Sequence, residues 1–464
     1  MSGSVAAVDL GATSGRVMLG HVGHDQLSIR MVSRFPNGPV RTADGELRWA
    51  LTELLEHVLD GLTAAVREQP DVASLGVDSW AVDYALLQGG RMLGEPFHYR
   101  DERNHAAVER VHALVPPEQL YAANGLQHLP FNTVFQLAAE RHLDVADALL
   151  LIPDLIAYRL TGRMVAERSN ASTTGLLSVT TGDWDAALIE RVGLPLRLLP
   201  ELVDAGTVVG PLLPEVRARI GSALDVIAVG SHDTASAVLA VPAATRDFAY
   251  ISCGTWGLVG VELDRPVLTE DARLANFTNE GGVDGTIRFL HNVMGLWLLS
   301  ECVREWGETD LPGLLDRAAA VTAPVGVFDP NDEVFLPPDG MPQRIERWLA
   351  EHDQPLPASR PELVRCIVES LATAFATAVQ DASALSGQPV SVIHLVGGGS
   401  QNELLCQLTA DRSGLPVLAG PVEATAIGNV LVQARAQGFV QGDLMSLRAL
   451  VARASSPRRY EPRA

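Results

Sequence analysis

Residues 5–22 contain two apolar strand patterns joined by one tight turn. Val5–Leu10 and Val17–Val22 read as buried strands, and Gly11–Arg16 between them is short, polar and contains glycine. Two strand patterns separated by so few residues are typical of a hairpin. The chain is therefore expected to build a sheet that carries a polar turn where its first strand ends.

A second copy of this pattern lies in the other half of the chain. Residues 248–263 again give strand, turn and strand, with Gly254-Thr-Trp-Gly257 at the turn. At 464 residues the chain is too long for one core, since the length prior is about 150 residues per domain. The two hairpins therefore indicate a faint internal duplication in a chain of two or three domains.

Other segments alternate between strand and helix patterns. Strands are predicted at 27–35, 74–80 and 392–396, and helices at 50–67 and 361–385. Residues 305–360 are rich in Pro, Gly and Asp and are predicted to be an ordered loop region. The polar tail from Ser455 is predicted to be loose.

Composition excludes several classes of partner. The net charge of −21 argues against nucleic acid or an anionic membrane. No apolar run approaches the ~20 residues of a membrane span and no secretion signal opens the chain, so the expected compartment is the cytoplasm. Four widely spaced cysteines are expected to be buried thiols, not a zinc site or a disulfide framework: Cys253, Cys302, Cys366 and Cys406.

The chain contains no lysine, and all 35 of its basic residues are arginine. A P-loop and a protein-kinase site both require lysine, so both are excluded. Any ATP phosphate must then be held by backbone amides, hydroxyl groups, a metal ion or arginine. The first turn offers such groups, because glycine lets backbone amides approach, Thr13 and Ser14 add hydroxyls and Arg16 adds charge. Asp9, at the strand end, is suited to hold Mg²⁺ through water, although an ordinary hairpin remains an alternative.

Asp233 is the candidate for chemistry. It lies in Gly230-Ser-His-Asp-Thr-Ala-Ser236, after the apolar run Val226–Val229 and before Ala237–Ala240, which fits a helix start. A carboxylate at this position would face a cleft, where it could take a proton from an alcohol. The alternative is a helix N-cap, since Asp before an apolar run accepts backbone N–H bonds.

Several of these motifs resemble known sugar kinases. The pattern Asp-x-Gly-x-x-x-x-Arg at residues 9–16 resembles the first phosphate motif of the actin, Hsp70 and sugar-kinase superfamily. From about residue 5 to 440, the stretches 76–84, 275–299 and 397–402 follow in the order found in the FGGY family of carbohydrate kinases. Among its members the chain is most similar to rhamnulokinases.

The resemblance implies an α/β fold of two actin-like, ribonuclease H-like domains with mixed sheets flanked by helices and an ATP cleft between them. Residues 1–240 would form the N-terminal domain for sugar and phosphate, 241–445 the nucleotide-binding C-terminal domain, and 446–464 a tail. The implied reaction is phosphorylation of L-rhamnulose at its C1 hydroxyl, giving L-rhamnulose 1-phosphate and ADP. ATP is the co-substrate and Mg²⁺ the cofactor, held at Asp9.

The resemblance also assigns roles residue by residue. Asp233 would be the base, and the sugar-binding residues would be Ala81, His232, Asp233, Thr234 and Asn292. The ATP-binding residues would be Ala12, Thr13, Ser14, Gly15, Arg16, Thr255, Ser300 and Gly398. Ser300 stands where relatives can carry a longer glutamine, and Asn292 could instead cap the apolar helix pattern that follows it.

Two other functions stay open. Another FGGY kinase, for L-fuculose, xylulose or a polyol, would keep the phosphate machinery and change only the sugar pocket. A non-catalytic actin-like switch would bind sugar and nucleotide and signal to a partner. Small molecules, not nucleic acid or membrane, are the expected ligands, and the chain is expected to be a monomer or a homodimer.

Overall fold

The computed structural model describes residues 2–463, which divide into two compact units. Unit 1 contains residues 1–244, 263–289 and 424–454, and unit 2 contains residues 245–262, 290–423 and 455–464. Unit 1 is thus assembled from three separate parts of the chain. No helix within residues 2–463 is long and apolar enough to cross a membrane.

Unit 1 is built on a six-stranded mixed sheet with the order β12-β13-β6-β1-β2-β3. The expected hairpin is present: β1 (Gly3–Leu10) pairs antiparallel with β2 (Ser14–Gly23), which pairs antiparallel with β3 (Gln26–Pro36). β1 pairs parallel with β6 (Val72–Ser79), and β6 pairs parallel with β13 (Asp225–Ile227). The carboxyl ends of β1, β6 and β13 therefore meet at one edge of the sheet.

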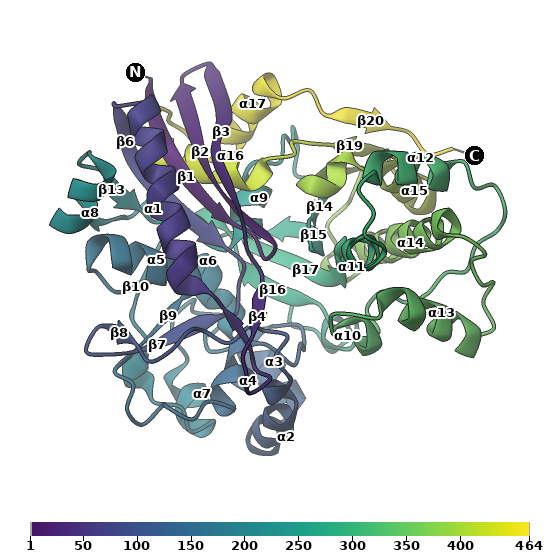
Figure 1. The fold of residues 1–464 in the computed structure, drawn as a ribbon, viewed down its shortest axis with the longest axis horizontal. Helices are drawn as coiled ribbons and strands as arrows, with labels where there is room; N and C mark the ends of the chain where they lie inside the picture. Colours follow the sequence, from purple (N-terminus) through teal and green to yellow (C-terminus); the bar gives the residue numbers. More distant parts are fainter. Residues whose placement is uncertain (1, 464) are drawn as a thin grey trace. The chain divides into compact units, whose positions relative to one another are not determined.

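Helices cover both faces of this sheet (Figure 1). Gly61 of α1 (Leu51–Glu68) lies against Val17, whereas Val430 of α16 (Ala424–Ala436) lies against Gly20. Positions 17 and 20 of one strand point to opposite faces, so the two helices pack on opposite sides. α16 also crosses α9 (Asp233–Leu239) closely, because a Cβ on Gly428 would lie 1.9 Å from the carbonyl oxygen of Ser236.

Smaller elements complete unit 1. A three-stranded sheet β8-β7-β9 packs with α2, α3, α4 and α7 around a separate apolar core. The remaining bounds are β4 Pro39–Arg41, β5 Leu47–Trp49, β7 Tyr84–Gln88, β8 Arg91–Met92, α2 His105–Leu114, α3 Pro117–Asn124, α4 Thr133–Ala138, β9 Ala148–Leu151, α5 Ile152–Thr161, β10 Val165–Glu167, α6 Arg168–Ala171, α7 Ala186–Arg191, β11 Glu201–Val203, β12 Val208–Pro211, α8 Pro214–Ile220, α10 Glu270–Leu274, β16 Thr278–Gly281 and α17 Leu444–Ala454.

Unit 2 repeats the strand arrangement of unit 1. β14 (Phe248–Cys253) pairs antiparallel with β15 (Trp256–Leu263) and parallel with β18 (Val392–Val396). β18 pairs parallel with β19 (Val417–Ala419), which pairs antiparallel with β20 (Arg458–Tyr460). The order β15-β14-β18-β19-β20 corresponds strand for strand to β2-β1-β6-β13-β12, so the internal duplication expected from the two hairpins is present.

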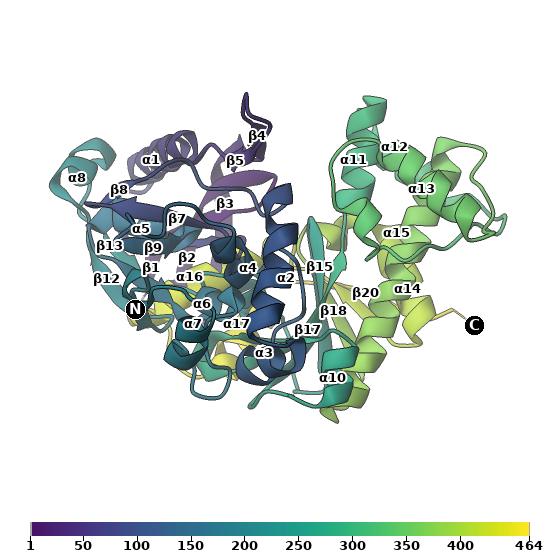
Figure 2. The same ribbon diagram turned by 90° about the horizontal axis from the view of Figure 1, so that it is seen from below.

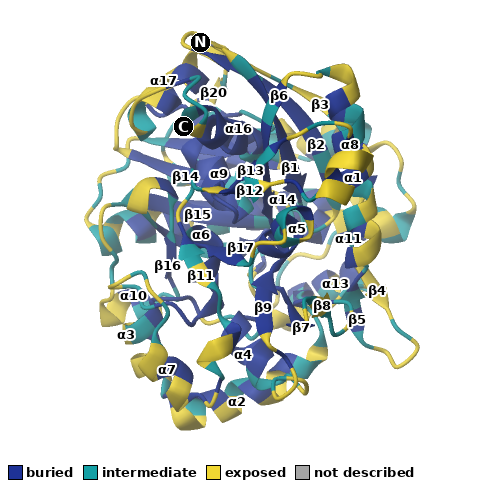
Figure 3. Cartoon of the chain, turned by 90° about the vertical axis from the view of Figure 1, so that its left-hand side faces the viewer, coloured by how far each residue is buried: buried dark blue, intermediate teal, exposed yellow. Residues whose placement is uncertain are grey.

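The helices of unit 2 gather beside its sheet (Figure 2), where α11 contacts α13 and α12 packs against α14. Buried residues, dark blue in Figure 3, run along the strands of both sheets, and exposed ones lie on the outer helices. The remaining bounds are β17 Ile287–Met294, α11 Trp297–Trp306, α12 Leu311–Ala319, α13 Met341–Glu351, α14 Arg360–Ser386 and α15 Glu403–Ser413. All four cysteines are buried free thiols, as expected.

The prediction that residues 305–360 form a loop region was wrong. This segment contains α12 and α13, joined by irregular chain. Leu314 and Ala318 of α12, and Met341, Ile345 and Leu349 of α13, are buried at a spacing of four. Apolar residues at this spacing form one helical face, and burial of that face outweighs the surrounding Pro, Gly and Asp.

Two further local predictions were wrong. Asn292 lies inside β17, and α11 begins five residues later after Leu296, so Asn292 does not cap that helix. The tail is also not loose throughout, because residues 458–460 form strand β20 and Tyr460 is buried. Pairing with the exposed edge of β19 supplies the hydrogen bonds that the polar tail sequence did not suggest.

Candidate active site

Two carboxylates lie side by side at the strand edge of unit 1. Asp9 of β1 and Asp78 of β6 are register partners, and both are buried. The Arg16 Nε donates to Asp9 Oδ2 at 2.9 Å from the paired strand β2. Burial and the negative charges of Asp9 and Asp233 raise the pKa of Asp78 well above its usual value. The strand ends thus concentrate negative charge next to the first turn.

A buried polar ladder supports Asp78 from helix α16. The Asn429 Nδ2 donates to Asp78 Oδ2, and the Gln433 Nε2 donates to Asn429 Oδ1 at 2.6 Å. Ser74 Oγ donates in turn to Gln433 Oε1 at 2.8 Å. Buried polar groups that satisfy one another in this way fix the register between helix and sheet.

The loop that carries Asp233 is held by its backbone. The Ser79 amide donates to the Ser231 carbonyl at 2.9 Å, which ties the loop to the end of β6. Glu167 Oε2 accepts from the Ser231 amide at 2.9 Å and from the Ser231 hydroxyl at 3.0 Å. Glu167 is buried at the end of β10, so the loop is anchored on two sides.

Asp233 is the first residue of α9 and does not cap it. The N-cap position is His232, and no side chain makes a capping hydrogen bond there. The Asp233 side chain is 31% exposed. Its Oδ1 accepts from the Thr234 hydroxyl at 3.0 Å and lies 3.6 Å from His232 Nε2. The capping interpretation of Asp233 is therefore wrong, and the carboxylate is accessible.

His232 is surrounded by two charged residues that the sequence did not single out. Its Nδ1 lies 3.0 Å from an Arg288 terminal nitrogen and 3.2 Å from Glu280 Oε2. Glu280 lies in β16 and Arg288 in β17, and both side chains are buried. No sequence pattern links positions 232, 280 and 288, because the fold alone brings these segments together.

The loop after β6 is strained and firmly held. Val82 has a φ of 66°, which is costly for a β-branched residue. Asp83 Oδ2 accepts from Trp49 Nε1 at 2.6 Å and from Trp80 Nε1 at 3.1 Å, and its Oδ1 accepts from Gln136 Nε2 at 2.9 Å. Burial raises the pKa of Asp83 to about 6, even though these donors favour the carboxylate. Strain fixed by a buried network is typical of functional loops, and Ala81 lies within this one.

The first turn is shorter than the glycine pattern suggested. It spans residues 11–13, and the Gly11 amide donates to the Ser14 carbonyl at 3.0 Å. Gly15 already belongs to β2, where a Cβ would lie 2.2 Å from the Phe35 ring. Gly15 is thus required for packing, whereas Ala12 and Thr13 form the accessible part of the turn.

In the corresponding turn and the glycine loop of unit 2, neighbouring residues also have different contacts and exposure. The Thr255 carbonyl accepts from the Gly295 and Trp297 amides at 3.2 Å, which holds the turn to the start of α11. After β18, a Cβ on Gly399 would lie 2.3 Å from Cys253 Sγ, whereas one on Gly398 would meet nothing within 4 Å. Gly398 is exposed, so its backbone is open to a flat ligand.

The candidate residues therefore fall into two groups. Unit 1 holds Asp9, the turn at 11–16, Ala81 and His232–Thr234, and it brings Asp9, Asp78 and Asp233 together at one sheet edge. Unit 2 holds Thr255, Asn292, Ser300 and Gly398. Ser300 is an exposed residue of α11, and Asn292 is half-buried in β17.

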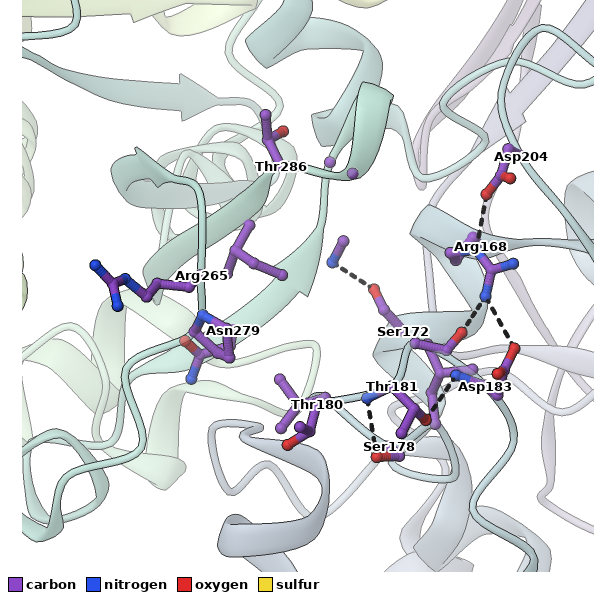
Figure 4. Close-up of a pocket in the computed structure, with 18 of the residues that line it drawn as sticks. Arg168, Ser172, Ser178, Thr180, Thr181, Asp183, Asp204, Arg265, Asn279 and Thr286 are labelled. Carbon is purple, nitrogen blue, oxygen red and sulfur yellow. Dashed lines mark hydrogen bonds and ion pairs between the residues drawn. The ribbon is translucent and has the colours of Figure 1, made fainter.

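Unit 1 also contains a cavity of about 750 Å³ (Figure 4). Arg168 lies on one wall, where its Nε donates to Asp204 at 2.7 Å, and Arg265, Asn279 and Thr286 line the other. Glu167 belongs to both the cavity lining and the support of the Ser231 loop.

Comparisons with known proteins identify relatives for the whole chain. Residues 4–240 match the N-terminal domain and residues 249–437 the C-terminal domain of the FGGY family of carbohydrate kinases. A rhamnulokinase from Bacteroides thetaiotaomicron is 42% identical over 463 residues, covering 98% of this chain and 95% of its own length. A rhamnulokinase from Pectobacterium carotovorum is 44% identical over 471 residues, covering 99% and 93%.

Solved structures confirm the fold. A xylulose kinase from Lactobacillus acidophilus has a TM-score of 0.80 at 18% identity and covers 99% of this chain and 94% of its own. A glycerol kinase from Plasmodium falciparum, solved with ADP, has a TM-score of 0.75 at 14% identity with coverage of 99% and 94%. The expected α/β fold with two sugar-kinase-like domains is therefore present.

Proposed function

Since the chain belongs to the FGGY family of carbohydrate kinases, we propose that it transfers a phosphoryl group from ATP to the C1 hydroxyl of L-rhamnulose, in L-rhamnose catabolism. The products are L-rhamnulose 1-phosphate and ADP. The observation that carries this proposal is the 42–44% identity to rhamnulokinases over 98–99% of the chain. The matched length spans both the phosphate turns and the candidate sugar residues.

Asp233 is the group that accepts the C1 hydroxyl proton. Its carboxylate is accessible and makes no capping bond, so its oxygens are not committed to the helix. His232 and Thr234, on either side, orient the carboxylate and the sugar. Phosphoryl transfer to an alcohol depends mostly on positioning and electrostatics, so no covalent intermediate with the protein is required.

Mg²⁺ would be held at Asp9. Carboxylate oxygens are the donors that Mg²⁺ prefers, and Asp9 and Asp78 supply them in register on neighbouring strands. Asp78 Oδ1 is buried and has no hydrogen-bond partner among residues 2–463, which fits a site that accepts further positive charge. When bound, Mg²⁺ offsets negative charge on the phosphates.

The remaining roles follow the two turns. In unit 1, residues 12–16 contact the ATP phosphates through backbone amides, the Thr13 and Ser14 hydroxyls and the Arg16 guanidinium. In unit 2, Thr255 contacts phosphate, and Gly398 and Ser300 contact the nucleoside. Ala81 contacts the sugar through its backbone, and Asn292 through its side chain.

The test of the substrate is a coupled assay of ADP release with L-rhamnulose, L-fuculose, L-ribulose, D-xylulose and glycerol. We expect the highest kcat/KM with L-rhamnulose and a product phosphorylated at C1. A clear preference for D-xylulose or glycerol contradicts the proposal and favours another FGGY activity. Absent turnover with tight sugar binding favours the non-catalytic switch.

The setting of the reaction is part of the proposal. An ATP co-substrate and four buried thiols, whose pKa values burial raises, favour the cytoplasm. Light scattering at working concentrations distinguishes a monomer from a homodimer, the two states that we expect.

A further inference from the structure

Arg288 holds a fully buried guanidinium against the ring of His232. Its side chain is 0% exposed, and its Nε donates to the Gly281 carbonyl at 3.0 Å. One terminal nitrogen lies 3.0 Å from His232 Nδ1 and 3.1 Å from Glu280 Oε2. Glu280 therefore balances the buried charge, and the fork of the guanidinium spans from the β16 backbone to the imidazole.

The Arg288 contact determines which nitrogen of His232 carries the proton. A guanidinium has only donors, so the Nδ1 that it contacts must offer its lone pair. The Arg288 contact has hydrogen-bond geometry, whereas the 3.2 Å approach of Glu280 Oε2 to the same nitrogen does not form a hydrogen bond. The ring proton therefore lies on Nε2, which is the nitrogen 3.6 Å from Asp233 Oδ1.

The position of the proton on His232 matters for Asp233, because His232 Nε2 lies next to the Asp233 carboxylate. The Thr234 hydroxyl and His232 Nε2 both approach Oδ1, at 3.0 and 3.6 Å. Both neighbours therefore approach the same oxygen of the Asp233 carboxylate. A donor on Nε2 attracts Oδ1, so neither of these two groups engages Oδ2.

We infer that Arg288 is a positioning residue for phosphoryl transfer, because it fixes His232 with Nε2–H toward Asp233 and so leaves Oδ2 to accept the proton. The inference rests on the proposed role of Asp233. Glu280 acts by balancing the charge of Arg288, and neither residue contacts the reacting atoms. The backbone of the same loop is anchored separately by Glu167, so a change at Arg288 acts on the ring.

The kinetic test is a double-mutant cycle between Arg288 and His232. Arg288→Lys keeps the charge beside Glu280 but cannot span both acceptors. His232→Gln places an amide N–H where Nε2–H stands, whereas His232→Asn does not reach that far. A misplaced reacting group costs up to about 100-fold in rate, so we expect Arg288→Lys to lower kcat about 10- to 100-fold with a smaller change in the sugar KM.

The two backgrounds separate positioning from stability. In the His232→Gln background no imidazole remains to be oriented, so we expect Arg288→Lys to change kcat less than about 3-fold. We also expect His232→Gln to retain more activity than His232→Asn. If Arg288→Lys lowers kcat equally in both backgrounds, or leaves it unchanged in the wild type, the inference is wrong.

A spectroscopic measurement tests the tautomer without any substrate. The ¹⁵N–¹H correlation spectrum of the full chain labelled at histidine, assigned by comparison with His232→Gln, should show His232 with its proton on Nε2. A proton on Nδ1 would overturn the inference. Because this measurement needs no sugar, it remains decisive even if the assay panel selects a substrate other than L-rhamnulose, and the kinetic cycle is then run with that sugar.

A second variant covers the case in which Arg288→Lys does not fold. Arg288→Met with Glu280→Gln removes both charges, which avoids leaving one of them buried and unpaired. Its folding is checked by thermal unfolding. We expect the Nδ1–H form of His232 to appear in its spectrum together with a lower kcat. An unchanged tautomer and an unchanged kcat in the folded variant would refute the role of Arg288.

Discussion

The Asp233→Asn variant tests whether Asp233 acts as a general base or has only a structural role. A general base contributes about 10²–10⁴ to the rate, which corresponds to about 3–5 kcal/mol of barrier at 1.36 kcal/mol per tenfold change. We expect kcat to fall within or beyond that range. Stability should hold, because the side chain is 31% exposed and makes no capping bond. The Asn amide oxygen can keep the Thr234 hydrogen bond, while its NH₂ takes the Oδ2 position.

Binding and a matched control complete this experiment. The NH₂ can donate to the sugar hydroxyl, so the sugar affinity measured by calorimetry should change far less than turnover. Asp185→Asn is the control, since Asp185 does cap a helix, accepting from the Leu188 amide at 3.0 Å. We expect that variant to stay folded and active, because Asn caps nearly as well as Asp. A folded Asp233→Asn protein with near-normal turnover would refute the assignment and move the search for the base to Asp9, Asp78 and Asp83.

Two further predictions concern stability and the glycine loop. Because the pKa of Asp83 is raised from 3.8 to about 6 in the folded state, its contribution to stability is complete below pH ~4 and lost as the pH rises through 6. Relative to Asp83→Asn, the wild type should therefore lose about 3 kcal/mol of unfolding free energy between pH 4 and 7 in urea titrations, and parallel pH profiles would contradict this. Gly399→Ala should lower stability by about 1–3 kcal/mol, because its Cβ would lie 2.3 Å from Cys253 Sγ. Gly398→Ala, its matched control, should keep the melting temperature and raise the KM for ATP, and equal effects of both variants on stability would refute this distinction.

Local patterns were enough to predict the strands and turns that carry many of the candidate site residues. The hairpin at residues 5–22 and its copy at 248–263 were confirmed. They could be predicted because an apolar run and a tight turn each depend on residues that are adjacent in the sequence. The loop prediction for residues 305–360 failed for the opposite reason. The apolar residues of its two helices are spaced four apart, with Pro, Gly and Asp in the surrounding sequence. The two helices can therefore be recognised only from the packing of these residues in unit 2.

Long-range contacts set the limit of what the sequence could reveal. Arg288 and Glu280 lie 56 and 48 positions from His232. Both fall within the stretch 275–299 that resembles the family, but nothing in that stretch indicates a contact with His232. The same holds for Glu167, which reaches Ser231 across 64 positions. These residues contact the loop of Asp233 from strands distant in sequence, so their contacts can be identified only in the folded structure.

The close crossing of α16 and α9 has a consequence for how the protein is made. Helix α16 meets the helix of Asp233 backbone to backbone at Gly428, and it supplies Asn429 to the carboxylate of Asp78. These contacts come from residues 424–436, which a ribosome synthesises after nearly all of unit 2. A nascent or truncated chain that ends before α16 therefore lacks the helix that packs on α9 and the donor to Asp78. The edge of the unit 1 sheet that carries Asp78 is therefore complete only after residues 424–436 have been synthesised.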